Sequence, residues 1–333
     1  KNFDLIGVYC NSDFSLHAAS EINKKYNLKG CNPNSVKFSI NKNFAKEMMS
    51  KFNLPTPQGI VVDAASLNIN NNKNLLFPLI VKPLDSSGSQ GVTYVKNDKE
   101  MKSAINYALK FSKKIIIEEF IEGNGIDTIG IMRNGNLFPC GLATRIFSDL
   151  PFRFPTHGYT GNFLSRSDQE EAFRITGLAA NAVGIFDGPV KADLLFHKGK
   201  FNLIEITPRF HGDVLTNKTI TYAYDFNPTK ELLSFLITGK LSNKSILDLD
   251  PKLILWKALF PLEDDINWTS LKNDNIVGER VLDLFIDPRY KFKCNIHKDN
   301  TSLSGFLFAE FDDIKHMNTY LKTFNSKYKG ILI

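Results

Sequence analysis

A predicted β-hairpin over residues 190–209 constrains the fold of this chain more than any other segment. Two apolar runs flank a short polar stretch in which Gly199 can adopt the positive φ that a tight hairpin loop requires. Because alternate residues of a strand point to the same face, the sequence places Glu205, Thr207 and Arg209 on one side of the hairpin. The second strand therefore has a polar face with a carboxylate and a guanidinium.

The loop length predicts how polar residues of the two strands pair. A three-residue loop ending at Gly199 would place Lys191 opposite Glu205, with Asp193 diagonal to Glu205 at roughly 7–8 Å. Two carboxylates at that separation favour a cation between them, and Mg²⁺ binds proteins through one or two carboxylates together with substrate phosphates. In the alternative interpretation, Lys191 neutralises Glu205 as a cross-strand ion pair and Asp193 is solvated. The hairpin alone does not distinguish between the two.

Composition excludes several classes of protein. The 333 residues are 43% hydrophobic and suffice for two or three subdomains, but no apolar run is long enough to span a membrane. Lys and Arg number 41 against 35 Asp and Glu, and the charges are scattered, so no nucleic-acid-binding stripe is predicted. The four cysteines are far apart and form neither a zinc motif nor a disulfide framework, which favours the cytoplasm. No signal peptide is visible, although the chain begins at Lys1 and its natural start is left open.

The N-terminal region is predicted to be the end of an α/β domain. Asp4–Cys10 is a short apolar run typical of a buried parallel strand, and His17–Tyr26 has the pattern of the following helix. A second helix is expected over 41–52, where Lys42 in the first turn opposes the helix dipole. Lys42 is either a phosphate ligand reaching out of this helix or an ordinary solvated lysine.

A loop of small residues follows the next predicted strand. Residues 77–83 form that strand, which ends near Lys82, and the loop 84–91 leads into a second strand at 92–95. Backbone N–H groups in such a loop can bind phosphate oxygens, and Lys82 could reach the same phosphates. The loop lacks the GxxxxGK[ST] pattern and joins strand to strand, so a P-loop NTPase is not indicated. The alternative is an ordinary hairpin turn.

The rest of the chain alternates strands and helices. A turn-rich, aromatic loop is expected over 147–164, and loops of this length are usually functional. The C-terminal part is predicted to be a small appended β-rich subdomain, whose isolated residues have no assigned role. The other expected elements are strands at 114–123, 128–132, 137–145, 254–260, 277–286 and 303–311, the hairpin turn Asn134-Gly135, and helices at 97–110, 167–184, 227–238 and 312–324.

In this order the segments resemble the ATP-grasp superfamily of carboxylate-amine and carboxylate-thiol ligases, most closely its carbamoyl-phosphate synthetase and biotin carboxylase branch. The resemblance implies an α+β fold in which two α+β subdomains clasp ATP over residues 41–235, with the smaller lid at about 75–122. A partial α/β pre-ATP-grasp domain would precede it at 1–40, and a small β-rich subdomain would follow at 236–333. The segments that carry the resemblance are Lys42, 80–83, 86–92, 117–123, Asp193 and 203–212.

The resemblance also implies an ATP site. Lys42 and Lys82 would hold the phosphates, and Lys82 would also take part in catalysis. The segment 123–127 is longer than the usual Gly-x-Glu of these ligases, which leaves the ribose contact open. The remaining implied contacts are Ser87, Gly88, Ser89 and Gly91 in the loop over the phosphates, Glu118, Glu119, Phe120 and Ile121 along the adenine, largely through backbone groups, and Asp127 at the ribose.

For the metal and the reaction, the resemblance implies one or two Mg²⁺ ions, with Mn²⁺ as an alternative. Asp193 and Glu205 would bind the metal. Thr207 stands where these ligases usually have Asn, which would weaken the hold on a second ion. Arg209 would stabilise charge as the γ-phosphoryl group moves to a carboxylate.

The implied activity is that of an ATP-dependent ligase, which activates a small carboxylic acid as an acyl phosphate and joins it to an amine. The substrates would be small molecules, amino acids among them, with no nucleic acid and no membrane involved and a homodimer left open. Alternatives are a nucleotide-binding regulatory protein with impaired catalysis, favoured by Thr207, and a bicarbonate-dependent carboxylase, which would need a biotin carrier. The substrate pocket is expected at Arg145, Arg153, His157, His211 and Gly212.

Overall fold

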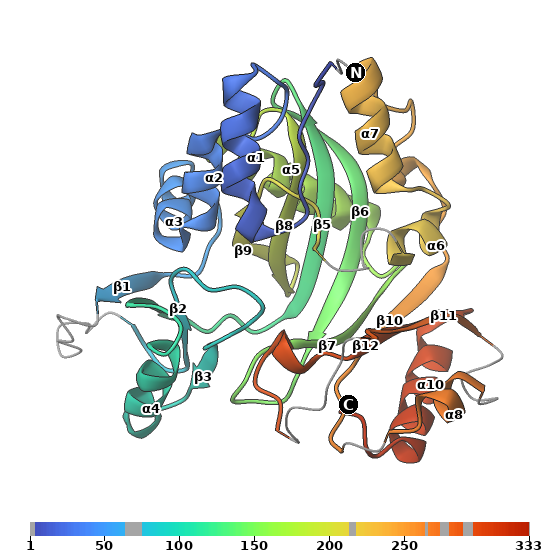
Figure 1. Cartoon of the computed structure of the whole chain (residues 1–333). Coiled ribbons are helices and arrows are strands. Elements are labelled where there is room, and N and C mark those ends of the chain that lie inside the picture. The colour runs from blue at the N-terminus through green and yellow to red at the C-terminus, as the bar shows by residue number, and fades with distance from the viewer. Residues whose placement is uncertain are drawn as a thin grey trace.

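The computed structural model describes residues 4–63, 75–212, 218–263, 266–273, 280–288 and 296–332. Two β-sheets, of four and eight strands, organise these residues (Figure 1). The helices are α1 Asp13–Lys25, α2 Pro33–Ile40, α3 Lys42–Lys51, α4 Asp98–Ala108, α5 Arg166–Ala182, α6 Ile220–Tyr224, α7 Pro228–Thr238, α8 Trp268–Asn273 and α10 Ile314–Lys327, with short 3₁₀ turns at Ile246–Asp248 and Asn300–Ser302. No helix in the described ranges is long and apolar enough to cross a membrane.

The N-terminal region contributes helices but no strand. The predicted strand at Asp4–Cys10 is wrong, since these residues form only one isolated parallel bridge, between Gly7 and Lys29. A strand needs a hydrogen-bonded neighbour along its length, and none of the described strands lies beside this segment. The expected helix is present as α1, and α3 matches the predicted helix at 41–52 closely.

The smaller sheet forms the lid subdomain. Its strand order is β1-β4-β2-β3, and α4 buries apolar residues such as Met101 and Ile105 against one face. The lid extends further toward the N-terminus than the predicted start at about 75, because β1 pairs with β4. Its strands are β1 Gly59–Asp63, β2 Leu79–Pro83, β3 Thr93–Val95 and β4 Lys114–Glu119.

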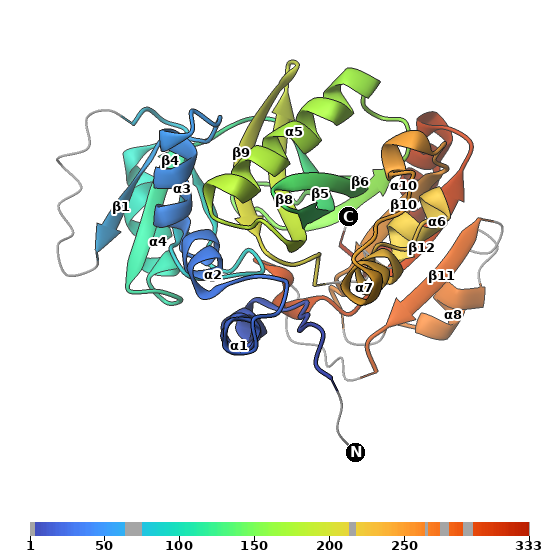
Figure 2. The same ribbon diagram turned by 90° about the horizontal axis from the view of Figure 1, so that it is seen from above.

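The larger sheet has the order β11-β12-β10-β7-β6-β5-β8-β9, and α5 packs on one face of β5, β8 and β9. The predicted loop at 147–164 contains β7, which pairs with β10 and thereby joins the C-terminal strands to this sheet. The lid and the C-terminal strands lie on opposite sides of β5, β8 and β9 (Figure 2). Its strands are β5 Asn124–Arg133, β6 Asn136–Phe147, β7 Pro155–Thr160, β8 Gly188–His197, β9 Lys200–Thr207, β10 Leu253–Leu259, β11 Val281–Ile286 and β12 Gly305–Phe311.

The C-terminal strands extend the large sheet instead of forming a separate layer. Strands β10 and β12 pair over their whole lengths, and helix α10 covers one face of them. Leu255, Leu307 and Phe324 meet in that buried layer and are fully buried. The other face of β10 and β12 is thus free to contribute to a site formed by the rest of the sheet.

The hairpin of β8 and β9 forms as predicted, but its register differs. The loop has two residues, Lys198 and Gly199, with φ of 48° and 76°, and β9 has one extra residue, Ile204, opposite the step from Asp193 to Leu194 in β8. Positive φ at both positions is the type I′ geometry that suits the twist of a hairpin. Asp193 therefore lies directly opposite Glu205, and the predicted partner Lys191 lies opposite Thr207.

Candidate functional site

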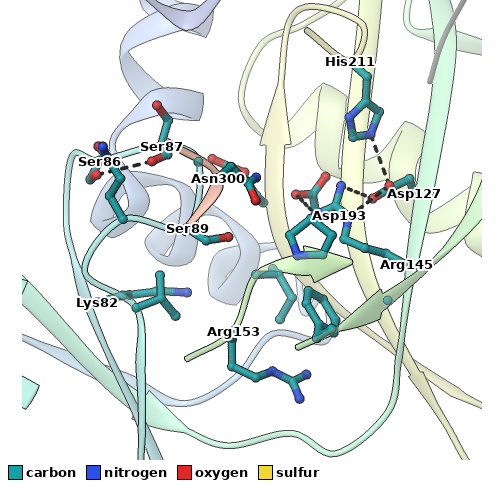
Figure 3. Close-up of a pocket in the computed structure, with 18 of the residues that line it drawn as sticks. Lys82, Ser86, Ser87, Ser89, Asp127, Arg145, Arg153, Asp193, His211 and Asn300 are labelled. Atoms are coloured by element: carbon teal, nitrogen blue, oxygen red, sulfur yellow. Dashed lines mark hydrogen bonds and ion pairs between the residues drawn. The ribbon is translucent and has the colours of Figure 1, made fainter. Parts of the chain in front are cut away.

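A cavity of about 470 Å³ lies between the lid and the large sheet, within the range typical of small-molecule sites. Its walls come from β2 and the following loop, the end of β4, the facing strands β8 and β9, and the C-terminal strands β10 and β12. Figure 3 shows the loop serines on one side and the acidic cluster on the other. The predicted site residues all line this cavity except Gly91, Thr207 and His157.

Lys82 and Glu118 form a buried ion pair inside the lid. The Lys82 Nζ contacts one Glu118 oxygen, and Lys46 Nζ lies 2.9 Å from the other. Burial would raise the pKa of Glu118, but the two lysines outweigh it and the pKa is lowered. Lys46 was not predicted, although it follows Lys42 by four residues and shares its helical face. Glu118 thus acts through its side chain, beyond the predicted backbone role.

Lys42 holds the backbone of the small-residue loop. Its Nζ donates to the carbonyl of Ser86 at 2.7 Å and to that of Leu84 at 3.4 Å. Burial lowers the pKa of the Lys42 ammonium. Together with Lys82, this lysine lines the cavity on the side of the loop, and the contact of the two lysines with phosphates stays a prediction.

The loop itself has a strained backbone that only small residues accommodate. Gly88, Ser89 and Gly91 have φ of 66°, 62° and 74°. A Cβ on Gly91 would come within 2.6 Å of the Pro83 ring, so this glycine shapes the loop without facing the cavity. Across the cavity, the N–H of Asn300 donates to the Gly88 carbonyl at 3.1 Å.

The segment after β4 forms the predicted adenine-side edge of the cavity. Glu119 accepts a hydrogen bond from the Gln58 N–H at 2.9 Å, and the Phe120 N–H donates to Pro78. The Phe120 ring packs edge-on against Tyr94 at 4.9 Å between centroids. These contacts fix the segment, and the adenine role of its residues stays a prediction.

Asp193 and Glu205 face the cavity from opposite strands. Lys191 Nζ lies 2.7 Å from Asp193 and 3.8 Å from Glu205, so the predicted ion pair and the predicted carboxylate pair occur together. Burial would raise the pKa of Asp193, but Arg145 and Lys191 outweigh it and the pKa is lowered. Thr207 is buried outside the cavity, and its Oγ1 has no hydrogen-bond partner in the described structure.

Arg145 connects a second aspartate to this cluster. Its guanidinium binds Asp127 through Nε at 3.1 Å and through Nη2, and it binds Asp193 through Nη1 at 3.1 Å. Burial raises the pKa of Asp127, and the neighbouring Asp193 adds to this effect. Arg145 is thus committed to two carboxylates, and Asp127 is committed to Arg145 (Figure 3). The predicted ribose contact of Asp127 and substrate contact of Arg145 remain predictions that this geometry does not favour.

Two overlapping sets of side chains could hold a cation. One is the predicted pair of Asp193 and Glu205 on the facing strands. The other combines Asp193 with Asp127 and His211, whose ligand atoms lie within 4.8 Å of one another. The His211 Nε2 is buried and lies 3.5 Å from an Asp127 oxygen, but it makes no hydrogen bond among the described residues (Figure 3). Burial lowers the pKa of this imidazole. Oxygen-rich donors on facing strands fit Mg²⁺.

Arg209 is held by the N-terminal region. Its Nε and Nη2 each lie 2.6 Å from an oxygen of Asp13, which stands in the first turn of α1. Burial would lower the pKa of Arg209, but Asp13 outweighs it and the pKa is raised. No local pattern in the sequence predicts this contact, because Asp13 lies 196 residues from its partner. Gly212 lies close by, and a Cβ there would come within 2.8 Å of the Asn11 carbonyl.

Arg153 and His157 have different positions. The Arg153 guanidinium lies over the Phe147 ring at 4.3 Å and the Phe120 ring at 5.4 Å, and no acidic side chain in the described ranges pairs with it. His157 lies opposite Lys257 in the register of β7 and β10, on the face of the sheet away from the cavity. Burial lowers the pKa of His157 to about 4. His157 is therefore not a cavity residue, contrary to the prediction.

The chain is similar to known ligases. Residues 48–206 match the sequence model described as "D-ala D-ala ligase C-terminus". A D-alanine–D-alanine ligase of Pseudomonas putida is 28% identical over 172 residues, which are 48% of this chain and 52% of that protein. The chain thus spans about half the length of such curated relatives.

Solved structures match over nearly the whole chain. An L-amino acid ligase from Bacillus licheniformis superposes with a TM-score of 0.79 at 18% identity, covering 99% of this chain and 80% of that one. A biotin carboxylase from Campylobacter jejuni, in complex with a nucleotide, gives 0.63 at 16% identity over 98% of this chain and 74% of that one. At these identities the likeness establishes the fold.

Proposed function

We propose that this chain is a member of the ATP-grasp superfamily and an ADP-forming ligase that joins a small carboxylic acid to an amine, which the match to the D-Ala–D-Ala ligase model and the shared fold support. The observation that carries the proposal is the arrangement of one cavity. Lys42 and Lys82 line its lid side, and Asp193, Glu205 and Arg209 line the opposite side. The two lysines proposed to bind phosphates thus face the two carboxylates proposed to bind a metal, and the Arg209 guanidinium lies beyond these carboxylates.

The reaction needs these groups because it brings anions together. One carboxylate oxygen of the acid attacks the γ-phosphorus of ATP, and ADP leaves. The amine nitrogen then attacks the acyl carbon, inorganic phosphate leaves, and the nitrogen loses one proton. Lys42 and Lys82 would hold the phosphates, and Arg209 would stabilise charge on the transferred group.

Mg²⁺ is the metal we propose, bound by Asp193 and Glu205, and it would neutralise charge on the β- and γ-phosphates. The acyl phosphate must be kept from water, and the loop of residues 84–91 would cover it. Of the two arginines predicted for a substrate carboxylate, Arg153 has no acidic partner in the described structure, whereas Arg145 has two. We therefore assign binding of the substrate carboxylate to Arg153. We also propose that the enzyme acts in the cytoplasm.

The second candidate is a nucleotide-binding regulatory protein without turnover. The pairing of Asp193 with both Lys191 and Arg145 favours it, because two cations already neutralise a proposed metal ligand. Thr207, in place of the usual Asn, points the same way.

Substrate-dependent release of ADP distinguishes the two candidates. The purified chain is incubated with MgATP and pairs drawn from amino acids and small carboxylic acids, and ADP is measured. The ligase proposal expects ADP, phosphate and an amide product in equal amounts for at least one pair. Nucleotide binding by calorimetry without ADP release for any pair would support the regulatory candidate instead.

A further inference from the structure

We propose that strands β10 and β12 form a specificity wall that receives the aromatic or large aliphatic side chain of an amino-acid substrate. The inference rests on the proposed function and adds the class of substrate. It concerns a part of the chain for which the sequence indicated no role. The wall consists of Trp256, Ala258, Phe260, Phe306 and Phe308, all of which line the cavity.

The pairing of the two strands puts these residues on one face. Trp256 lies opposite Phe308, and Ala258 lies opposite Phe306. Residues two apart on a strand share a face, so Phe260 continues the same surface. The intervening residues face the buried layer under α10. The wall is therefore part of a sheet that is supported from behind.

The rings of the wall support one another. Trp256 and Phe306 pack edge-on with centroids 6.4 Å apart, and Phe306 stacks on Phe308 at 6.3 Å. Phe260 is fully buried and meets Phe154 edge-on at 5.0 Å. Such a surface is preorganised, so a bound side chain would not have to order it.

Gly158 sets the position of the indole. It lies opposite Trp256 on β7, and a Cβ there would come within 2.7 Å of the indole Nε1. The missing side chain lets the Trp256 ring lie directly against β7. The indole therefore fills space beside the strand, and the small Ala258 leaves room next to it on the cavity side.

The wall and the predicted nucleotide contacts belong to different strands of one cavity. The predicted adenine contacts lie at the end of β4 and the predicted metal ligands on β8 and β9, whereas the wall lies on β10 and β12. A side chain bound at the wall therefore leaves the predicted nucleotide contacts free, while the carboxylate or amine of the same molecule remains in the cavity that those contacts line.

Arg153 indicates what kind of ligand this is. Its neighbours in sequence, Phe152 and Phe154, pack in the aromatic cluster of the wall, and its guanidinium lies over the Phe147 and Phe120 rings. Arg153 lines the same cavity as the wall and has no acidic partner among the described residues. A cavity with an apolar wall and a cation that lacks an acidic partner suits a molecule with a large apolar side chain and a carboxylate, as in an amino acid.

The test compares amino acids of different side-chain size. ADP release is measured with MgATP and a fixed partner acid or amine while glycine, alanine, leucine, methionine and phenylalanine are varied. One methylene in an apolar pocket changes kcat/KM by roughly 10–200-fold. We expect phenylalanine or leucine to exceed alanine by at least about tenfold.

Three variants of the wall locate the effect. Trp256→Ala should raise KM for the large amino acid at least about tenfold and leave KM for ATP unchanged. Trp256→Phe should restore most of the preference. Ala258→Leu fills the space beside the indole and should shift the preference toward alanine. Trp268→Ala removes a tryptophan that lies outside the cavity and is the matched control, with wild-type preference expected.

Direct binding separates this inference from the proposed function. Phenylalanine and alanine are titrated by calorimetry into the full chain with MgADP present. If phenylalanine binds, Trp256→Ala abolishes that binding and no substrate pair releases ADP, the wall is a side-chain site and the ligase proposal is wrong. If only small or charged substrates release ADP and the wall variants do not change this release, the ligase proposal holds and the specificity wall is wrong.

Discussion

Glu118 is expected to hold Lys82 of the lid and Lys46 of α3 in place, and its removal should cost more stability than the removal of any surface carboxylate. The change Glu118→Gln keeps the size of the side chain but leaves Lys82 and Lys46 facing each other without a counter-charge. Removing one partner of a buried ion pair costs about 3–5 kcal/mol. Because Gln retains one acceptor for a lysine, we expect a loss at the lower end, about 3 kcal/mol.

The pH dependence of this loss has a defined sign. The pKa of Glu118 is lowered in the folded protein, so the carboxylate contributes stability above the ordinary pKa of Glu, roughly 4.3. That contribution is lost as the pH falls through the lower folded pKa. The difference between wild type and Glu118→Gln should therefore be full at pH 7 and shrink progressively below about pH 4.

The free energy of unfolding in urea, followed by circular dichroism at pH 7 and at lower pH, measures both effects. Glu100→Gln is the control, because Glu100 makes an exposed ion pair at 3.9 Å with Lys96, which precedes α4. Exposed pairs contribute about 1 kcal/mol or less. Equal midpoints for the two variants, or a Glu118→Gln loss that does not change with pH, would refute the argument that this buried carboxylate stabilises the lid.

Four further outcomes follow from the site and the core. Arg209→Ala should leave ATP binding by calorimetry nearly intact and abolish ADP release, and a large loss of ATP affinity would contradict its assigned role. Asp13→Asn should lower kcat for ADP release roughly 10–100-fold with KM for ATP unchanged, because it loosens Arg209, and an unchanged kcat would disprove that positioning. Chelation of divalent metal should stop ADP release, and more added Mg²⁺ should be needed to restore it in Asp193→Asn than in the wild type. ADP release in excess chelator would exclude the metal role. Burial lowers the pKa of Lys257 from 10.5 to about 8, so Lys257→Met should raise the free energy of unfolding by up to about 3 kcal/mol at pH 7. This gain should shrink as the pH rises from about 8 to 10.5. A gain that does not change with pH would show that packing, and not the buried charge, causes it.

The central hairpin shows what local sequence can specify. Apolar alternation and Gly199 predicted both strands, and the Asn134-Gly135 turn likewise predicted the hairpin of β5 and β6. The predicted register of the first hairpin was wrong, because a two-residue loop and a bulge at Ile204 in β9 replace the expected three-residue loop. A bulge is decided by packing of the whole sheet, so the sequence of the two strands does not reveal it.

Contacts between distant segments were harder to predict. Asp13 and Arg209 are far apart in the chain, and no local pattern joins them. The contribution of β10 and β12 to the cavity depends on β7, a strand hidden within a segment that contains several turn residues. Lys46 is different, since its spacing from Lys42 was available as a signal.

The continuity of the eight-stranded sheet affects how such a protein could change its chemistry. The carboxylate-bearing strands and the aromatic strands belong to one hydrogen-bonded sheet, and the lid touches the region of the aromatic strands through contacts such as that of Asn300 with Gly88. Replacements at one margin of the sheet can therefore alter which molecule is accepted without moving the groups at the other margin. New substrates would be acquired by remodelling β10 and β12, while the machinery for phosphoryl transfer is inherited intact.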